Sequence, residues 1–303
     1  MSSKVPLLLS PAQLHELRST TDVSILDASW HMPNSPRNAK QEFLSRRIPG
    51  ARYLDLDEVA SPNSLGLRHM MPSGPTFAHA LDHRYSYDSV GIFSSPRALF
   101  MLKSFGHDKS SVLDGGLPSW EVHGLPIESG PVGESPRGNY PIPTMQSDSV
   151  RSYEQMVSNA KDELISNVDA ELVLDARSRG RYLGVDPEPR PGLSSGHIPK
   201  SFSLPFNAFL QSHAVPNSDK TYTTYLPPDE LKRALVDAVG EEHAKQILDG
   251  KRSVTASCGS GMTAGVLYLG LKLIAESSRV AIYDESWTGY ASRPESEIVK
   301  STS

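Results

Sequence analysis

The chain has 303 residues and only one cysteine, Cys258. A single thiol excludes an intramolecular disulfide and any metal site built from several cysteines. This composition favours a protein of a reducing compartment. A thiol reaction that needs a second cysteine would have to take it from another molecule.

Long apolar runs and an excess of positive charge are also missing. No stretch approaches the roughly 18 apolar residues that cross a bilayer, and the net charge is −5. We therefore expect neither a membrane nor nucleic acid as a partner. The apolar segment near Met1 is short for a secretory signal, and the start lacks the arginines of a transit peptide. The predicted location is the cytoplasm, with the mitochondrion as the alternative.

Four segments of the first half recur in the same order in the second half, which indicates a duplication. The pairs are Ile25–Ala28 with Val173–Ala176, Arg47–Ala51 with His197–Ser201, Tyr87–Gly91 with Ser257–Gly261, and Val112–Trp120 with Ile282–Trp287. Residues 123–148 between them are rich in Gly, Pro and Ser, as extended linkers are. We predict domains over residues 1–135 and 149–303, joined by a linker over 136–148.

Short β-branched apolar runs alternate with helical patterns in both halves. Ser10-Pro11 and Pro227-Pro228 are typical helix starts, with proline in the first turn. The alternation predicts an α/β fold of two domains, each a parallel sheet with helices on both faces. Ligands of such sheets bind beyond the carboxyl ends of the strands.

The two halves differ in length. Ile48 and Asp88 are 40 positions apart, whereas Ile198 and Cys258 are 60 positions apart. The run His83–Tyr87 before Asp88 is a poor candidate for a buried central strand, because such strands are continuously apolar. We therefore expect the first domain to be shortened.

Cys258 follows the apolar run Ser253–Ala256 and precedes a helical pattern over Ala264–Leu271. This order predicts a strand, a tight loop and a helix, with the thiol facing the amino end of the helix. Unpaired amides and the helix dipole favour an anion at that place, here a thiolate. A buried structural cysteine is the alternative, but the small residues Gly259 to Gly261 favour a loop that wraps its amides around the sulfur.

Arg181 and Arg190 are nine positions apart in a segment broken by glycine and prolines, which indicates one loop. Two guanidinium groups can grip an α-keto acid, because each binds a carboxylate in a bidentate manner. The alternative is that these arginines pair with the neighbouring Asp186 and Glu188.

These motifs resemble those of tandem-rhodanese sulfurtransferases of the 3-mercaptopyruvate type, including fungal members. The segments that carry the resemblance are Asp27–Trp30, Arg47–Ala51, His69–Pro72, Phe93–Arg97, Gly180–Tyr182, Pro187–Arg190, Gly196–Pro199 and the cysteine loop. The resemblance implies a catalytic second domain and a non-catalytic first domain. Asp88 in the place of the cysteine agrees with this division. The family has an apolar strand before that position, and it has glycine where this chain has Lys200 and Glu285, so altered turns are expected there.

The resemblance implies that Cys258 takes sulfur from 3-mercaptopyruvate as a persulfide, releases pyruvate and passes the sulfur to thioredoxin or a small thiol. No metal and no organic cofactor is implied. The amides of the loop residues hold the sulfur anion; the residues concerned are Gly259, Ser260, Gly261, Met262 and Thr263. One alternative is a thiosulfate sulfurtransferase, although that branch has basic residues after its cysteine. Another is a low-activity sulfur-relay protein that serves partners in tRNA or cofactor thiolation.

The resemblance also assigns the remaining site residues. Arg181 and Arg190 match the positions that hold the pyruvate part of the substrate. Ser260, His69 and Asp57 match a proton relay that would protonate the pyruvate enolate. The spacing between Asp57 and His69 is one residue longer than the family pattern, so Asp57 matches least well. A cysteine-based phosphatase is disfavoured, because no arginine follows Cys258 within its loop.

Overall fold

The computed structural model describes residues 5–21, 23–80, 85–133, 141–162, 167 and 169–301. The chain divides into two compact units. The first unit comprises Met1–Ser61, Met71–Gln146 and Leu210–Tyr225, and the second comprises Pro62–Met70, Ser147–Phe209 and Leu226–Ser303. The first half of the sequence thus contributes Pro62–Met70 to the second unit, and the second half contributes Leu210–Tyr225 to the first unit. The domain boundaries expected from the sequence, 1–135 and 149–303, stay a prediction.

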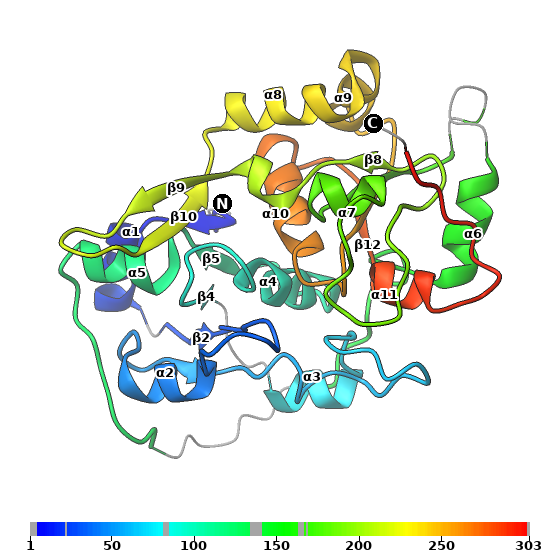
Figure 1. Ribbon diagram of the computed structural model, residues 1–303. Coiled ribbons are helices and arrows are strands. Elements are labelled where there is room, and N and C mark those ends of the chain that lie inside the picture. The colour runs from blue at the N-terminus through cyan, green and yellow to red at the C-terminus, as the bar shows by residue number, and fades with distance from the viewer. Residues whose placement is uncertain are drawn as a thin grey trace. The chain divides into compact units, whose positions relative to one another are not determined.

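The first unit contains a parallel five-stranded sheet in the order β1-β5-β4-β2-β3. Its strands β5, β4 and β2 are labelled in Figure 1. Its strands are β1 (Leu8–Leu9), β2 (Ile25–Asp27), β3 (Arg52–Tyr53), β4 (Tyr85–Tyr87) and β5 (Ser111–Leu113). Its helices are α1 (Pro11–Thr20), α2 (Ala39–Ser45), α3 (Gly74–Ala80), α4 (Ser95–Ser104) and α5 (Gly116–Val122). Ser10 and Gln13 form a capping box at the start of α1, which confirms the predicted helix start.

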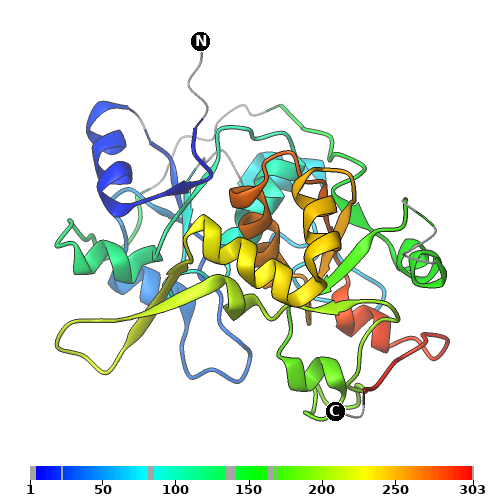
Figure 2. The ribbon, with the colours of Figure 1, turned by 90° about the horizontal axis from the view of Figure 1, so that it is seen from above.

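The second unit contains a parallel five-stranded sheet in the order β6-β12-β11-β7-β8. Its strands are β6 (Val150–Arg151), β7 (Leu172–Asp175), β8 (Phe202–Ser203), β11 (Val254–Ser257) and β12 (Val280–Tyr283). Its helices are α6 (Tyr153–Lys161), α7 (Arg179–Leu183), the 3-10 helix η1 (Phe206–Phe209), α8 (Pro228–Val239), α9 (Glu241–Leu248), α10 (Ala264–Ile274) and α11 (Ser286–Ala291). Helix α8 packs against α10 (Figure 2).

The two sheets have the same topology, which confirms the duplication and the α/β fold. In both sheets the strand order follows the same path along the chain. Three of the repeated sequence segments overlap the matching strands β2 and β7, β4 and β11, and β5 and β12; the fourth ends directly before β3 and β8. The prediction of parallel sheets flanked by helices is therefore confirmed.

The expectation for the run His83–Tyr87 is wrong in part, because β4 is a central and buried strand. Tyr85 to Tyr87 pair with β2 on one side and with β5 on the other. Tyr87 is fully buried in the core with Trp120, and its hydroxyl accepts a hydrogen bond from the Ile48 amide at 3.4 Å. The tyrosine rings of β4 therefore pack into the core of this sheet, and the Tyr87 hydroxyl has a backbone partner there. His83 and Arg84 lie outside the described residues.

Additional elements account for the greater length of the second half. Between β8 and β11 the chain forms η1, an antiparallel hairpin of β9 (Leu210–Ala214) and β10 (Thr221–Tyr225), and helices α8 and α9. Between β3 and β4 the only helix among the described residues is α3. The hairpin belongs to the first unit, where the Thr223 hydroxyl accepts a hydrogen bond from the Ile92 amide at 3.1 Å and the Tyr225 amide donates to Asp114 at 3.0 Å.

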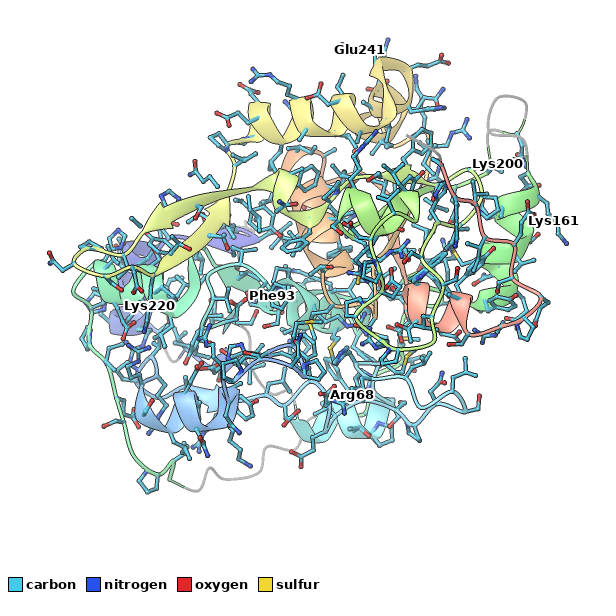
Figure 3. The ribbon with its side chains drawn as sticks, in the orientation of Figure 1. Arg68, Phe93, Lys161, Lys200, Lys220 and Glu241 are labelled. Carbon is cyan, nitrogen blue, oxygen red and sulfur yellow. The ribbon has the colours of Figure 1, made fainter. Side chains whose placement is uncertain are left out.

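The two turns that lack the family's glycine behave differently. Lys200 has φ 62°, close to the φ of 78° at Gly50 in the first repeat, so this turn keeps its left-handed residue. The Lys200 ammonium donates to the Asp162 carbonyl at 2.7 Å beyond the end of α6, near Lys161 (Figure 3). Glu285 has φ −67°, whereas Gly115 has φ 77°. The expected change of turn is therefore found at Glu285 only.

Each unit has its own apolar core. Leu9, Ile25, Phe43 and Trp120 are among the buried residues of the first core. The second core includes Met156, Val173, Tyr283 and Trp287. In the described part of the chain, no helix is both long and apolar enough to cross a membrane.

Candidate active site

Cys258 lies directly after β11, at the carboxyl end of the second sheet. The strand is buried along its whole length, and the cysteine itself is 2% exposed. Its amide donates to the Ser286 hydroxyl at 3.1 Å, and its carbonyl accepts from the Trp287 amide at 2.9 Å. These bonds tie the cysteine to the start of α11. The predicted order of strand, loop and helix is confirmed, because α10 begins at Ala264.

The loop after Cys258 is short and built from small residues. Gly261 has φ 81°, a left-handed conformation that a side chain would disfavour. The Gly259 carbonyl accepts hydrogen bonds from the amide and the hydroxyl of Thr288. The Thr263 side chain makes no cap bond to α10. The loop therefore brings Cys258 to the amino end of α10, where the helix dipole favours an anion and where the amides of Gly265 and Val266 donate to the carbonyls of Met262 and Thr263.

The matching loop of the first repeat holds an anion. Asp88 follows β4 as Cys258 follows β11, and it is fully buried. Its carboxylate accepts five backbone hydrogen bonds of 2.9–3.1 Å and one from a hydroxyl; the donors are Val90, Gly91, Phe93, Ser94 and Ser95, the last through both its amide and its hydroxyl. Gly91 and Gly261 occupy the same place in the two loops, and both have positive φ. This likeness supports the prediction that the loop of Cys258 stabilises a negative charge.

Arg181 and Arg190 lie beside the cysteine loop. A Cβ atom placed on Gly259 would be 3.1 Å from Nη2 of Arg181 and 3.8 Å from Nη1 of Arg190. The absence of a side chain at Gly259 thus leaves room for the Arg181 guanidinium, whereas Arg190 lies at an ordinary contact distance from the same place. Burial lowers the pKa of Arg190, repulsion from Arg181 lowers it further, and Cys258 acts in the opposite direction. The structure therefore brings the thiol and the two predicted arginines together.

Arg181 also has a carboxylate partner, which was the alternative left open by the sequence. Its Nε and Nη2 donate to Glu188 at 3.1 and 2.6 Å. Arg177 donates to the same carboxylate at 2.8 Å and to Asp175 at the end of β7. The pairing with Glu188 is therefore found for Arg181, while binding of an α-keto acid by Arg181 and Arg190 stays a prediction.

The three residues of the predicted proton relay lie in two units. Ser260 is half-buried in the cysteine loop, and His69 is buried in Pro62–Met70, which belongs to the same unit. Leu67 of that segment comes within 3.2 Å of a Cβ placed on Gly289 in α11. Asp57 belongs to the first unit, where it accepts a hydrogen bond from the Trp30 indole at 3.1 Å. The relay stays a prediction.

Several polar residues of the repeated segments make structural contacts. His197 bonds to the Tyr182 carbonyl at 2.8 Å, and the two rings stack at 3.9 Å. Burial lowers the pKa of His197, so the neutral imidazole is favoured. Asp27 and Asp175 each accept a hydrogen bond from the amide two residues further on and thereby cap the ends of β2 and β7.

Some residues around Cys258 were not predicted, namely Ser286, Thr288 and Arg177. Ser286 is fully buried with φ 51°, although it is not a glycine. Gly116 has φ 54° at the matching place, so comparison of the repeats could have identified this position. The contact of its hydroxyl with the Cys258 amide could not be predicted, because it joins residues 28 positions apart.

The groups at this site suit an organic anion better than a metal ion. In the part of the chain that the structure describes, no three His, Cys, Asp or Glu side chains gather as they would to hold a metal. The thiol is accompanied by guanidinium groups, which repel cations and bind carboxylates.

Comparison with known proteins places the chain among the sulfurtransferases. It is 36% identical, over 96% of its length and 85% of the relative's, to thiosulfate/3-mercaptopyruvate sulfurtransferase 2 of Arabidopsis thaliana. It is 35% identical, over 89% of its length and 86% of the relative's, to a probable 3-mercaptopyruvate sulfurtransferase of Schizosaccharomyces pombe. No protein-family model matches the chain.

Solved structures agree with this relationship. The Tum1 protein of Saccharomyces cerevisiae superposes with a TM-score of 0.79 at 27% identity, covering 98% of this chain and 99% of that one. SseA of Escherichia coli, described as a 3-mercaptopyruvate sulfotransferase with the rhodanese fold, superposes with a TM-score of 0.75 at 27% identity, covering 93% and 99%. The chain belongs to the 3-mercaptopyruvate sulfurtransferase family of tandem rhodanese-like proteins.

Proposed function

We propose that this protein transfers sulfur from 3-mercaptopyruvate to a thiol acceptor through a persulfide on Cys258. The Cys258 thiolate attacks the sulfur of the donor, and a new S–S bond forms. The electron pair of the C–S bond goes to carbon, which leaves the enolate of pyruvate. The enolate takes up a proton to become pyruvate, and an external thiol then attacks the persulfide and removes its outer sulfur.

The observation that carries this proposal is the position of Arg181 and Arg190 beside Gly259. An α-keto carboxylate is planar and offers oxygen pairs that fit the fork of a guanidinium group. Both arginines reach the residue that follows Cys258. A donor held through its carboxylate would therefore have its sulfur-bearing carbon close to the thiol, and binding energy would be used for orientation.

We further propose that Ser260, His69 and Asp57 supply the proton to the enolate. A hydroxyl backed by an imidazole and a carboxylate can move protons near neutral pH. The buried position of His69, in the same unit as Ser260, supports this role. The amides of Gly259, Gly261, Met262 and Thr263 would stabilise the sulfur anion, as the matching amides of the first repeat stabilise Asp88.

The acceptor must be a thiol of another molecule, because Cys258 is the only cysteine. We propose thioredoxin or a small thiol, in the cytoplasm or the mitochondrion. A relay to a protein partner is the second candidate. It is favoured by likeness to a structure described as the sub-stoichiometric sulfur transferase subunit of yeast mitochondrial complex I, with a TM-score of 0.80 at 29% identity over 98% of this chain and 100% of that one.

The proposal is tested by steady-state kinetics with 3-mercaptopyruvate and thiosulfate. We expect a higher kcat/KM for 3-mercaptopyruvate. Arg181→Lys and Arg190→Lys should each lower that value about ten- to a hundredfold, since a charged hydrogen bond contributes roughly 1.5–3 kcal/mol and lysine lacks the fork. A preference of the wild type for thiosulfate, or unchanged kinetics in both variants, would refute the substrate assignment.

A further inference from the structure

We propose that Glu188 is a positioning residue that sets the donor specificity of the site. It fixes the guanidinium of Arg181 and limits the positive charge beside Cys258 to what a monoanionic donor requires. This inference rests on the proposed function, and it concerns a residue that would not itself touch the substrate.

The Glu188 side chain is held more firmly than its place in a loop would require. Pro187 and Pro189 on either side are exposed, yet the Glu188 side chain is 2% exposed. Oε1 accepts from Arg177 at 2.8 Å and from Nε of Arg181 at 3.1 Å, and Oε2 accepts from Nη2 of Arg181 at 2.6 Å. A buried carboxylate with both oxygens bonded to guanidinium groups has a defined orientation.

The other partner of Glu188 is itself anchored to the sheet. Arg177 is buried, donates to Asp175 at the end of β7 and to the Gly196 carbonyl at 2.6 Å, and lies 4.1 Å from the ring of Trp287. The amide of Trp287 bonds to the Cys258 carbonyl. The orientation of Arg181 is therefore fixed, through Glu188 and Arg177, by elements that also hold the cysteine.

The bonds to Glu188 use one edge of the Arg181 guanidinium, namely Nε–H and one N–H of Nη2. The donors of Nη1 and the second N–H of Nη2 remain on the other edges. Nη2 is also the atom that approaches Gly259. Arg181 thus has a fixed edge toward Glu188 and a further set of donors for the carboxylate of a donor molecule.

The charges of Asp175, Arg177, Glu188 and Arg181 alternate in sign along their chain of ion pairs, and their sum is zero. Asp175 and Glu188 carry negative charges, and Arg177 and Arg181 carry positive charges. Glu188 also attracts Arg190 electrostatically, but no carboxylate among the described residues forms an ion pair with Arg190, whose charge is therefore the least compensated of the three arginines. Arg68 also acts on Arg190, but it is exposed and screened by solvent (Figure 3). 3-Mercaptopyruvate carries one negative charge at its carboxylate, whereas thiosulfate carries two.

Two substitutions separate the positioning effect from the charge effect. Glu188→Gln removes the negative charge and sets an NH₂ group against arginine donors. It should lower kcat/KM for 3-mercaptopyruvate about tenfold and leave that for thiosulfate unchanged or higher. Glu188→Asp keeps the charge but shortens the reach to Arg181. It should lower the value for 3-mercaptopyruvate without a gain for thiosulfate.

A double-mutant cycle with Arg181→Lys tests whether Glu188 acts through Arg181. If it does, Glu188→Gln should have little further effect on 3-mercaptopyruvate kinetics once Arg181 has been replaced. Glu171→Gln is the matched control. Glu171 also forms a bidentate pair with an arginine, Arg151, but it lies just before β7, at the opposite end of the sheet from Cys258.

The outcomes distinguish this inference from the proposed function. A wild type that does not use 3-mercaptopyruvate would refute the function itself. If the wild type uses 3-mercaptopyruvate, two results would refute the positioning role alone. One is a fall in kcat/KM that is equal for both donors in the Glu188 variants. The other is a double variant whose loss of kcat/KM is the product of the losses caused by Glu188→Gln and Arg181→Lys. Thermal unfolding checks that each variant is folded. If Glu188→Gln does not fold, Glu188→Asp and its cycle with Arg181→Lys decide the question.

Discussion

At the scale of single residues, the proposed chemistry centres on one thiol, Cys258, with the guanidinium groups of Arg181 and Arg190 beside the next residue, Gly259. Cys258, Arg181 and Arg190 could be predicted from the sequence, because their residue types and their places after a strand or in a loop define what they can bind. Glu188 could be named only as one of two alternative partners. Its burial and its bond to Arg177 depend on how the loop packs, which no local pattern encodes.

Replacement of Cys258 by serine should abolish sulfur transfer and leave the fold intact. Serine occupies nearly the same space, and the backbone bonds of residue 258 to Ser286 and Trp287 do not involve the thiol. Wild-type protein treated with 3-mercaptopyruvate should gain the mass of one sulfur atom and lose it when a thiol is added. The measurement is the intact mass of both proteins, with thermal unfolding as the control. Turnover by Cys258→Ser at the wild-type rate would contradict the persulfide mechanism.

At the scale of elements, the sequence predicted the segments around the cysteine well and the first sheet less well. The apolar run before Cys258 and the helix after it are β11 and α10. Strand β4 was missed, because the rule for buried parallel strands counts aliphatic residues, whereas Tyr85 and Tyr87 pack their rings into the core. The hairpin β9–β10 belongs to the first unit although it comes from the second half, and no periodicity in sequence reveals such an exchange.

Asp88→Asn should destabilise the first unit by about 3 kcal/mol. The carboxylate accepts six hydrogen bonds from the loop before and at the start of α4, and an amide would place N–H groups against N–H donors. The measurement is the free energy of unfolding in urea. Asp108→Asn serves as the control, because Asp108 is exposed and the lysine that contacts it bonds to its backbone carbonyl. Equal stability of the two variants would show that the amides of the Asp88 loop do not depend on a charge.

At the scale of the whole molecule, duplication has produced two sheets of the same order with different buried charges. The order of the motifs in the sequence was enough to predict the shared topology, since each motif marks one strand and its following loop. The pKa values of buried groups could not be predicted in the same way. Asp27 and His197 occupy ordinary motif positions, and only their packing shows that burial disfavours the charged form of each.

Acidification from pH 7 to pH 5 should therefore stabilise the first unit and destabilise the second. Burial raises the pKa of Asp27 from 3.8 to about 6, and it raises the pKa of Asp114 by a similar amount, to about 6. The folded first unit thus binds more protons than the unfolded chain between about pH 4 and pH 6, so its stability falls as the pH rises through this window. Burial lowers the pKa of His197 below 6.5, so the stability of the second unit is lost as the pH falls through that region. Although burial acts to raise it, the pKa of Glu42 is lowered to about 2 by pairing with Arg37 and His31. Protonation of Glu42 therefore reduces the stability of the first unit only below about pH 4.5.

The test is hydrogen exchange of the amides in β2 and β7 at pH 5 and pH 7, corrected for the intrinsic pH dependence of exchange. Protection of β2 relative to β7 should rise on acidification. In Asp27→Asn this rise should be smaller, because one of the two carboxyl groups that take up a proton is gone, and the remaining rise should come from Asp114 and His197. A ratio of protection that is the same at both pH values would contradict the pKa shifts of Asp27, Asp114 and His197 together. A rise that is undiminished in Asp27→Asn would instead assign the effect to Asp114 and His197 alone.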